Sequence, residues 1–176
     1  YFDATGLDAH QARAGWERSF GDTVRWLPSL QIASGGFVGG SLNVEVGKTW
    51  FVGAGLGRTN QLPYYNLNYD PNDAMTLASG YRAPSGASYA LSLTKDNRDN
   101  PDQQHLHATY RTPLESGDRL TVDILFKQGL VGGSPINRIG ATITYDWPKF
   151  FIRVAFDPNA NFSADDVVRI STGMRF

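Results

Sequence analysis

The sequence predicts an all-β protein, specifically a transmembrane antiparallel up-and-down β-barrel. The composition, with 19 Gly, 9 Pro, 12% aromatic and only 19% charged residues among 176, is typical of β structure. Segments of about ten residues alternate apolar and polar side chains, and their connections alternate between tight turns and longer polar stretches. The length suits one domain over residues 1–176, and it leaves open that this domain is the C-terminal part of a longer chain.

Eleven strands are predicted from the alternating segments, each bounded by residues that form turns. About ten residues suffice for a tilted β-strand to cross the hydrocarbon layer of a membrane. The predicted strands are 9–19, 23–34, 38–46, 50–59, 74–83, 87–95, 104–113, 119–129, 137–146, 149–157 and 167–176. Tight turns with Gly, Pro or Asp are expected at 20–22, 47–49, 84–86, 115–118 and 146–149. Longer connections are expected at 35–40, 60–73, 96–103, 130–135 and 157–166.

Every predicted strand has one apolar and one polar face, which two kinds of barrel can explain. In a soluble barrel of the lipocalin or avidin type the apolar face points inward, whereas in a membrane barrel it points to lipid. We favour the membrane barrel because arginine outnumbers lysine on the polar face. In addition, eleven strands enclose too wide a space for one apolar face to fill.

Aromatic residues gather within a few positions of the tight turns, as in the interfacial girdle of a membrane barrel. They are Trp16, Trp26, Trp50, Tyr81, Tyr89, Tyr110, Tyr145, Trp147 and Phe150.

The last ten residues, VVRISTGMRF, place Val168, Ile170, Met174 and Phe176 on one face, with Thr172 between them. This pattern resembles the C-terminal strand signal of Gram-negative outer-membrane β-barrel proteins, a terminal aromatic preceded by alternating apolar residues. The resemblance implies location in the bacterial outer membrane and recognition by its assembly machinery. It also implies that the short turns are periplasmic and the long connections extracellular.

The number of strands is odd, whereas single-chain bacterial barrels have even numbers. An open sheet edge in hydrocarbon leaves backbone groups unpaired, at several kcal/mol each. We therefore expect a barrel of twelve strands, with the twelfth upstream of Tyr1, or of ten if residues 35–40 do not separate two strands.

The polar face is rich in cations, which predicts a lumen that passes or exports anionic solutes. Acidic oligosaccharides or polysaccharides and small carboxylated or phosphorylated molecules are the expected solutes. The lumen-facing cations are Arg13, Arg25, Arg82, Arg111, Arg119, Lys127, Arg138, Arg153, Arg169 and Arg175, and the acids are Glu17, Glu45, Asp123 and Asp146. Other acids are assigned to the long connections: Asp70, Asp73, Asp96, Asp99, Asp102, Asp157, Asp165 and Asp166.

Two alternatives to a channel remain open. One is a non-conducting structural or surface-interaction barrel, plugged by pairs such as Arg13 with Glu17, or Arg119 and Arg153 with Asp123. The other is a lipid- or peptide-acting enzyme that uses His105 or His107 at the rim, near Asp102. We expect no enzyme, because the sequence shows neither a third metal ligand nor an activated serine.

The expected partners are the lipid bilayer, lipopolysaccharide, the assembly machinery and the anionic solute. Acidic residues of the long connections could bridge lipopolysaccharide phosphates through divalent cations, or be simply solvated. A net charge of −1 argues against nucleic-acid binding. The absence of cysteine excludes thiolate metal sites, and no cofactor is expected.

Overall fold

The computed structural model describes residues 11–33, 37–57, 74–96, 102–159 and 164–174, and these form a single antiparallel sheet of twelve strands. No helix occurs among these residues. The strands are β1 (Gln11–Gly15), β2 (Arg18–Phe20), β3 (Val24–Ala33), β4 (Phe37–Val46), β5 (Trp50–Gly57), β6 (Ala74–Arg82), β7 (Ser88–Asp96), β8 (Gln103–Pro113), β9 (Arg119–Val131), β10 (Ser134–Asp146), β11 (Phe150–Asp157) and β12 (Val167–Met174). The predicted all-β, up-and-down architecture is confirmed.

The first two strands are two parts of one strand, since β1 and β2 both pair with β3 in the same register. The interruption lies opposite Pro28, which has no N–H with which to continue the ladder. A bond from the Trp16 N–H to the Pro28 carbonyl, 3.2 Å long, still holds the two chains together there. The sheet therefore has eleven positions, as predicted.

Residues 35–40 do separate two strands, so the alternative count of ten is wrong. β3 and β4 pair with each other from Val24 and Val46 to Ala33 and Phe37. The predicted connection was too long at its C-terminal end, because residues 37–40 belong to β4.

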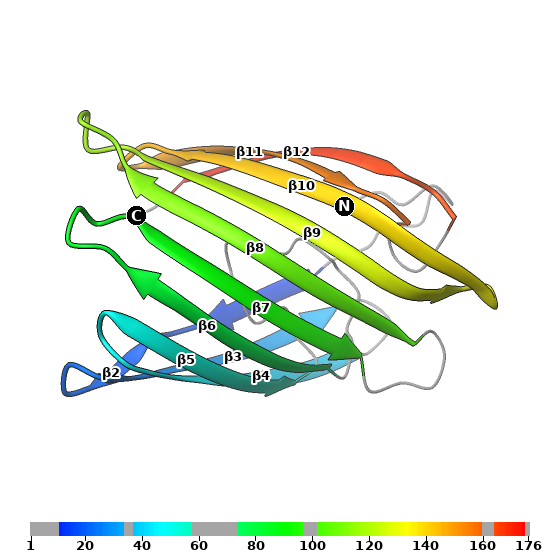
Figure 1. Cartoon of the computed structure of the whole chain (residues 1–176), viewed down its shortest axis with the longest axis horizontal. Helices are drawn as coiled ribbons and strands as arrows, with labels where there is room; N and C mark the ends of the chain where they lie inside the picture. Colours follow the sequence, from blue (N-terminus) through cyan, green and yellow to red (C-terminus); the bar gives the residue numbers. More distant parts are fainter. Residues whose placement is uncertain (1–10, 34–36, 58–73, 97–101, 160–163, 175–176) are drawn as a thin grey trace.

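The sheet curls around a central space, with its strands tilted to the long axis (Figure 1). Each strand pairs with its neighbour in the sequence, from β1 at one end of the order to β12 at the other. Among the described residues no ladder joins β1 to β12, so the sheet is open at this seam.

Short turns join the strands at one end of the sheet (Figure 1, left), and at the other end most successive strands are separated by longer stretches of sequence. The prediction of a long connection at 130–135 is wrong, because β9 and β10 run on to Val131 and Ser134 and are joined by Gly132 and Gly133 alone. Both glycines have positive φ, 55° and 81°, as a two-residue hairpin turn requires. The β9–β10 hairpin consequently projects beyond its neighbours (Figure 1).

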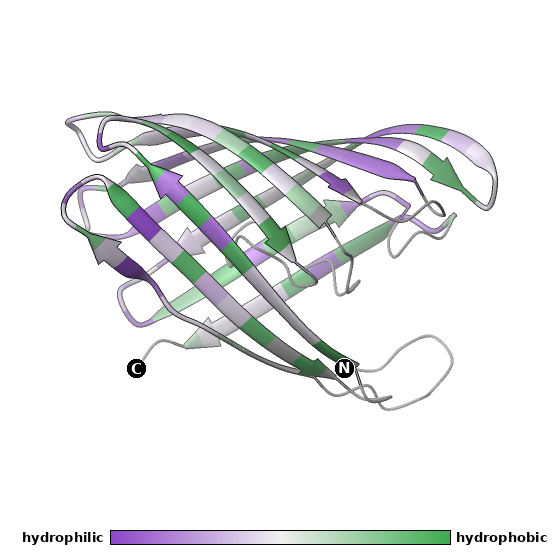
Figure 2. Cartoon of the chain, turned by 90° about the horizontal axis from the view of Figure 1, so that it is seen from below, coloured by the Kyte–Doolittle hydropathy of each residue, from purple (hydrophilic) through white to green (hydrophobic). Residues whose placement is uncertain are grey.

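The apolar face of the sheet is exposed and its polar face is buried, the reverse of the arrangement in a soluble protein. Apolar side chains point outward, and Ile170 is 73% exposed, whereas Lys127 and Asp123 on the inner face are 1% and 2% exposed. Hydrophobic and hydrophilic residues alternate along most strands (Figure 2). Only Phe51, Ala87, Leu125 and Ala155 are buried hydrophobic residues in the described part of the chain.

No helix with the length and apolar character of a membrane span occurs among the described residues.

Candidate functional site

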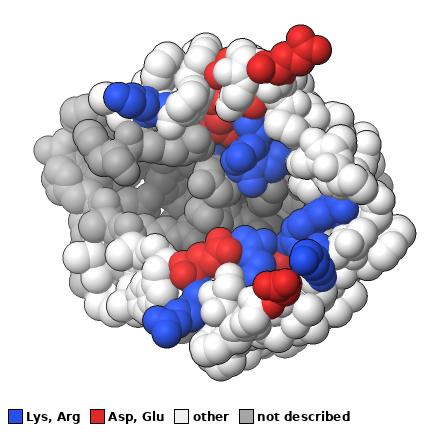
Figure 3. Space-filling model, turned by 90° about the vertical axis from the view of Figure 1, so that its left-hand side faces the viewer, with Lys and Arg blue, Asp and Glu red and all other residues white. Residues whose placement is uncertain are grey.

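The inner face of the sheet carries two clusters of charged side chains, one near each end. The short-turn cluster consists of Glu17, Arg25, Glu45 and Arg82. Arg25 donates from Nε to Glu17 over 2.7 Å and from Nη1 to Glu45 over 3.1 Å, and Arg82 also bonds Glu45. Arg25 and Glu45 are direct cross-strand partners of β3 and β4, so the register itself places them together. Around the hollow at this end, basic and acidic side chains lie side by side (Figure 3).

Two phenylalanines next to the short turns lie over glycines on the inner face. The Phe51 ring covers Gly80, its cross-strand partner, and a Cβ at Gly80 would lie 2.4 Å from that ring. The Arg82 guanidinium stacks on the same ring, 4.1 Å from its centre. Phe151 lies over Gly173 in the same way. Glycine is needed at Gly173 because the ring occupies the side-chain space, and at Gly80 because a Cβ would also lie 2.3 Å from the Tyr89 carbonyl oxygen.

A row of arginines and hydroxyls crosses the inner face from β6 to β12. Successive cross-strand partners form it, and all of them are polar: Arg82, Ser88, Arg111, Thr121, Thr144, Arg153 and Ser171. Arg153 donates from Nε to the Thr144 hydroxyl over 3.0 Å, which fixes its guanidinium. The neighbouring rows contain the buried carboxylates Asp123 and Asp146. The arginine row therefore combines guanidinium and hydroxyl donors at one level.

The second group, the Lys127 cluster, lies near the long connections and consists of Lys127, Arg138, Asp157, Asn159 and Arg169. Lys127 Nζ lies 2.9 Å from Asp157 Oδ1, and Arg169 Nη2 lies 3.0 Å from Asp157 Oδ2. Arg138 donates to Asn159 Oδ1 over 3.3 Å. One buried carboxylate thus lies between two cations, which satisfies both of its oxygens.

The two inner-face histidines have polar partners on their own and the next strand. Asp123 accepts from the Thr109 hydroxyl over 2.6 Å and contacts His107 Nδ1 at 2.8 Å. His105 Nε2 bonds Gln103. Asp102, predicted to lie near these rings, instead pairs with Lys95 in an exposed bridge. In the described part of the chain, no group of three His, Asp or Glu side chains could hold a metal ion.

Most of the predicted lumen residues lie on the inner face, but their balance and pairing differ from the expectation. Glu17, Arg119 and Arg138 are exposed, the Arg13 side chain and Arg175 lie outside the described residues, and the others are buried or half-buried. Glu17 pairs with Arg25, and the predicted pair of Glu17 with Arg13 lies outside the described side chains. Asp123 is bound by Thr109 and His107, neither of which was predicted.

Asp157 was wrongly assigned to an external connection. It ends β11 on the inner face, two and four positions after Ala155 and Arg153, and the same alternation could have predicted this. With Asp157 counted, the described inner face has eight cations against five acids, a smaller excess than predicted. The cations are Arg25, Arg82, Arg111, Arg119, Lys127, Arg138, Arg153 and Arg169, and the acids are Glu17, Glu45, Asp123, Asp146 and Asp157.

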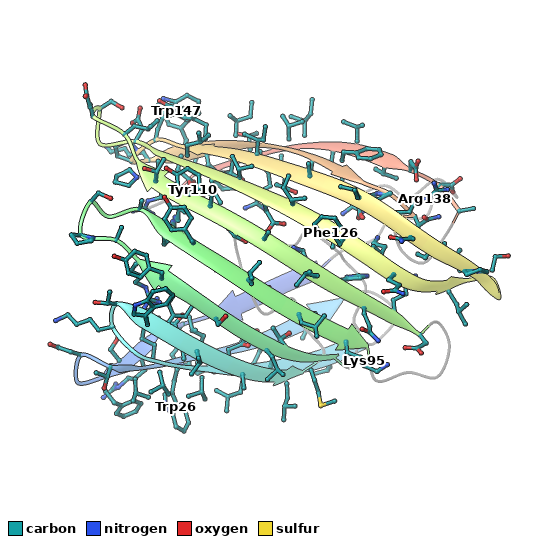
Figure 4. All side chains as sticks on the ribbon, viewed as in Figure 1. Trp26, Lys95, Tyr110, Phe126, Arg138 and Trp147 are labelled. Carbon is teal, nitrogen blue, oxygen red and sulfur yellow. The ribbon has the colours of Figure 1, made fainter. Side chains whose placement is uncertain are left out.

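The aromatic residues near the short turns form a belt on the outer face. Neighbouring rings contact each other, as in Trp50 with Tyr81 at 4.7 Å and Tyr89 with Tyr110 at 5.0 Å between ring centres. Trp26, Tyr110 and Trp147 project outward toward the short-turn end (Figure 4). The rings of Trp50, Tyr81, Tyr89 and Tyr110 also line an apolar groove of about 850 Å³.

In the final strand, Val168, Ile170 and Met174 are exposed on the outer face, while Phe176 lies outside the described residues. Comparison with protein-family models, curated proteins and solved structures gave no match to this chain. The functional assignment therefore depends on the geometry of the two faces.

Proposed function

We propose that this chain is a β-barrel of the bacterial outer membrane, with its apolar face in lipid. The observation that carries the proposal is the reversed burial, since exposed leucine, isoleucine and valine side chains occur on every long strand. Monomeric soluble proteins rarely expose such extensive apolar surface to water. Lipid-facing strands of membrane barrels have this apolar-out, polar-in alternation.

The aromatic belt supports an orientation with the short turns in the periplasm and the long connections outside the cell. Tryptophan and tyrosine favour the level of the lipid headgroups, where the ring is in apolar surroundings and the polar atom in water. β12 ends at the short-turn end, which agrees with a C-terminal assembly signal presented on the periplasmic side. The exposed Val168, Ile170 and Met174 would be available to assembly machinery.

Tryptophan fluorescence is expected to locate the belt in a membrane. In vesicles, lipids brominated near the headgroup should quench Trp16, Trp26, Trp50 and Trp147 more strongly than lipids brominated near the chain ends, because the belt lies at the interface. The matched control is Trp50→Phe, which should remove the signal of the most exposed indole, 73% exposed in the structure. Absence of quenching at any depth would contradict a membrane location.

The biochemical activity that we propose is passage of anionic solutes through the interior. The inner face has an excess of cations, and low-dielectric walls concentrate the field of such charges. The arginine row offers guanidiniums with hydroxyls between them, which suit carboxylate or phosphate oxygens. Acidic oligosaccharides or polysaccharides and small organic anions are the corresponding solutes.

Planar-bilayer recording tests this activity through ion selectivity. The wild-type protein is expected to favour chloride over potassium, and the double substitution Arg111→Gln, Arg153→Gln to reduce that preference several-fold, because two cations leave the arginine row. Arg18→Gln is the control, since Arg18 in β2 is exposed and pairs with Trp26 of β3, away from the arginine row. An unchanged permeability ratio in the double variant would exclude the arginine row as the selective element.

A non-conducting barrel is the second candidate function, and the Lys127 cluster favours it. Side chains as polar as Lys127, Gln103 and Thr144 are almost completely buried on the inner face, so part of the interior is filled. A reconstituted wild-type protein that is silent at every voltage would support this candidate.

A further inference from the structure

The chain does not leave the interior where β11 ends. Asp157, Pro158 and Asn159, here called the inner segment, follow Phe156 and are all buried, with Pro158 less than 2% exposed. Asn159 has a φ of 49°, a left-handed conformation that asparagine tolerates better than most residues. Connections normally run over the surface, so the burial of the first two residues of this one, Pro158 and Asn159, is unusual.

Lys127 binds the inner segment through all of its donors. An ammonium has three N–H groups, and Nζ lies 2.9 Å from Asp157 Oδ1, 2.7 Å from the Pro158 carbonyl and 3.2 Å from the Asn159 carbonyl. Two of these three acceptors are backbone oxygens, so Lys127 fixes the path of the chain as well as a side chain.

Further contacts to the inner segment come from β10, β12 and the chain just before β12. Arg169 in β12 binds Asp157, and Arg138 in β10 binds Asn159. The Asn159 N–H donates to Asp166 Oδ1 over 3.1 Å. Arg138 lies toward the long-connection end of the sheet (Figure 4).

Pro158 packs directly against Gly140 of β10. A Cβ at this position would lie 2.9 Å from Pro158 Cδ and 2.7 Å from the Phe156 carbonyl oxygen. Any side chain there would displace Pro158 or the strand beside it. The inner segment therefore fits a site with matched shape, charge and hydrogen bonds.

We propose that the inner segment is an internal plug that narrows the interior at the long-connection end from the side of β9 to β12, and that Lys127 is the residue that holds it in place. This proposal rests on the proposed membrane barrel and names the constriction of its pathway. A turn that only joined β11 to β12 could remain in water, without the desolvation cost of burying Lys127 and Asp157. Release of the plug would widen the interior for solutes from that end.

Cysteine labelling tests the plug directly, because the chain has no cysteine of its own. Ser92→Cys places a reporter on the inner face, one cross-strand row beyond the row of His105 and Lys127. Ser88→Cys places a second reporter in the arginine row, closer to the short turns. Each reporter is made in the wild-type background and together with Lys127→Met. An anionic methanethiosulfonate reagent is then added to intact cells that carry these proteins, so that it arrives from the long-connection side.

Lys127→Met is expected to raise the labelling rate of the Ser92 reporter about tenfold, since labelling follows the population of the open form. The Ser88 reporter should then be labelled more slowly than the Ser92 reporter, because reagent reaches it last. Lys95→Met is the matched control, an exposed lysine near the same end whose ion pair with Asp102 is also exposed. It should leave both rates unchanged.

A second variant, Asp157→Asn, is measured in parallel because Lys127→Met could fail to fold, which heat-modified gel mobility would show. Asp157→Asn keeps the shape of the side chain and removes its charge, and this variant is expected to raise the labelling rate of the Ser92 reporter several-fold. Unchanged Ser92 labelling in the folded variants overturns the plug, even if the wild-type protein conducts anions. Faster labelling without any conductance supports the plug and rejects anion conduction.

Discussion

Asp157→Ala is expected to lower the free energy of unfolding by about 3–5 kcal/mol, the usual cost of breaking a buried ion pair from one side. The substitution leaves Lys127 without its 2.9 Å partner and Arg169 without its 3.0 Å partner, and the Lys127 side chain is only 1% exposed, so its charge stays buried. The measurement is a urea titration in lipid vesicles, followed by tryptophan fluorescence.

Asp22→Ala serves as the control for this prediction. Asp22 forms an ion pair with Lys48 over 3.4 Å, and both side chains are largely exposed. Its removal should change the free energy of unfolding by less than about 1 kcal/mol, as for other surface pairs. Equal effects of the two substitutions would mean that the Lys127 cluster is solvated.

Gly80→Ala is the other substitution with a large expected effect, a loss of about 3 kcal/mol of stability from overpacking. The added Cβ would lie 2.3 Å from the Tyr89 carbonyl oxygen and 2.4 Å from the Phe51 ring. The ring can turn away, but the carbonyl belongs to the β6–β7 ladder, so the ladder itself must shift. Urea titration of the folded protein measures the loss.

Gly173→Ala gives a matched comparison, because its nearest contacts are all atoms of the Phe151 ring, from 2.6 Å. The double substitution Gly173→Ala, Phe151→Ala should therefore recover the loss caused by the methyl group. In contrast, Phe51→Ala should not rescue Gly80→Ala, since the Tyr89 carbonyl remains. Full rescue in both pairs would show that the backbone contact at Gly80 relaxes easily.

The period-2 pattern predicted most of the fold because one face of each strand is consistently apolar. Leu120, Val122 and Ile124 alternate with Thr121 and Asp123 so regularly that β9 could be identified without tertiary information. The same pattern predicted which residues share the inner face. It also placed Asp123 and Asp146 there correctly.

Pairing between inner-face residues was less predictable, since it depends on register and on side-chain length. Arg25 meets Glu45 because β3 and β4 pair in one particular register, which the sequence alone does not define. The burial of residues 157–159 was not predicted, for another reason. Asp, Pro and Asn are typical of exposed turns, and only the tertiary contacts of Lys127 and Gly140 bury them here.

The projecting β9–β10 hairpin has a practical consequence for studies of the intact cell. Gly132 and Gly133 are exposed, and nothing lies within 4 Å of a Cβ built on either. An epitope tag inserted between them would disturb few native contacts, as at other exposed loop tips. Antibody access to such a tag on living bacteria would report which side of the membrane this tip occupies.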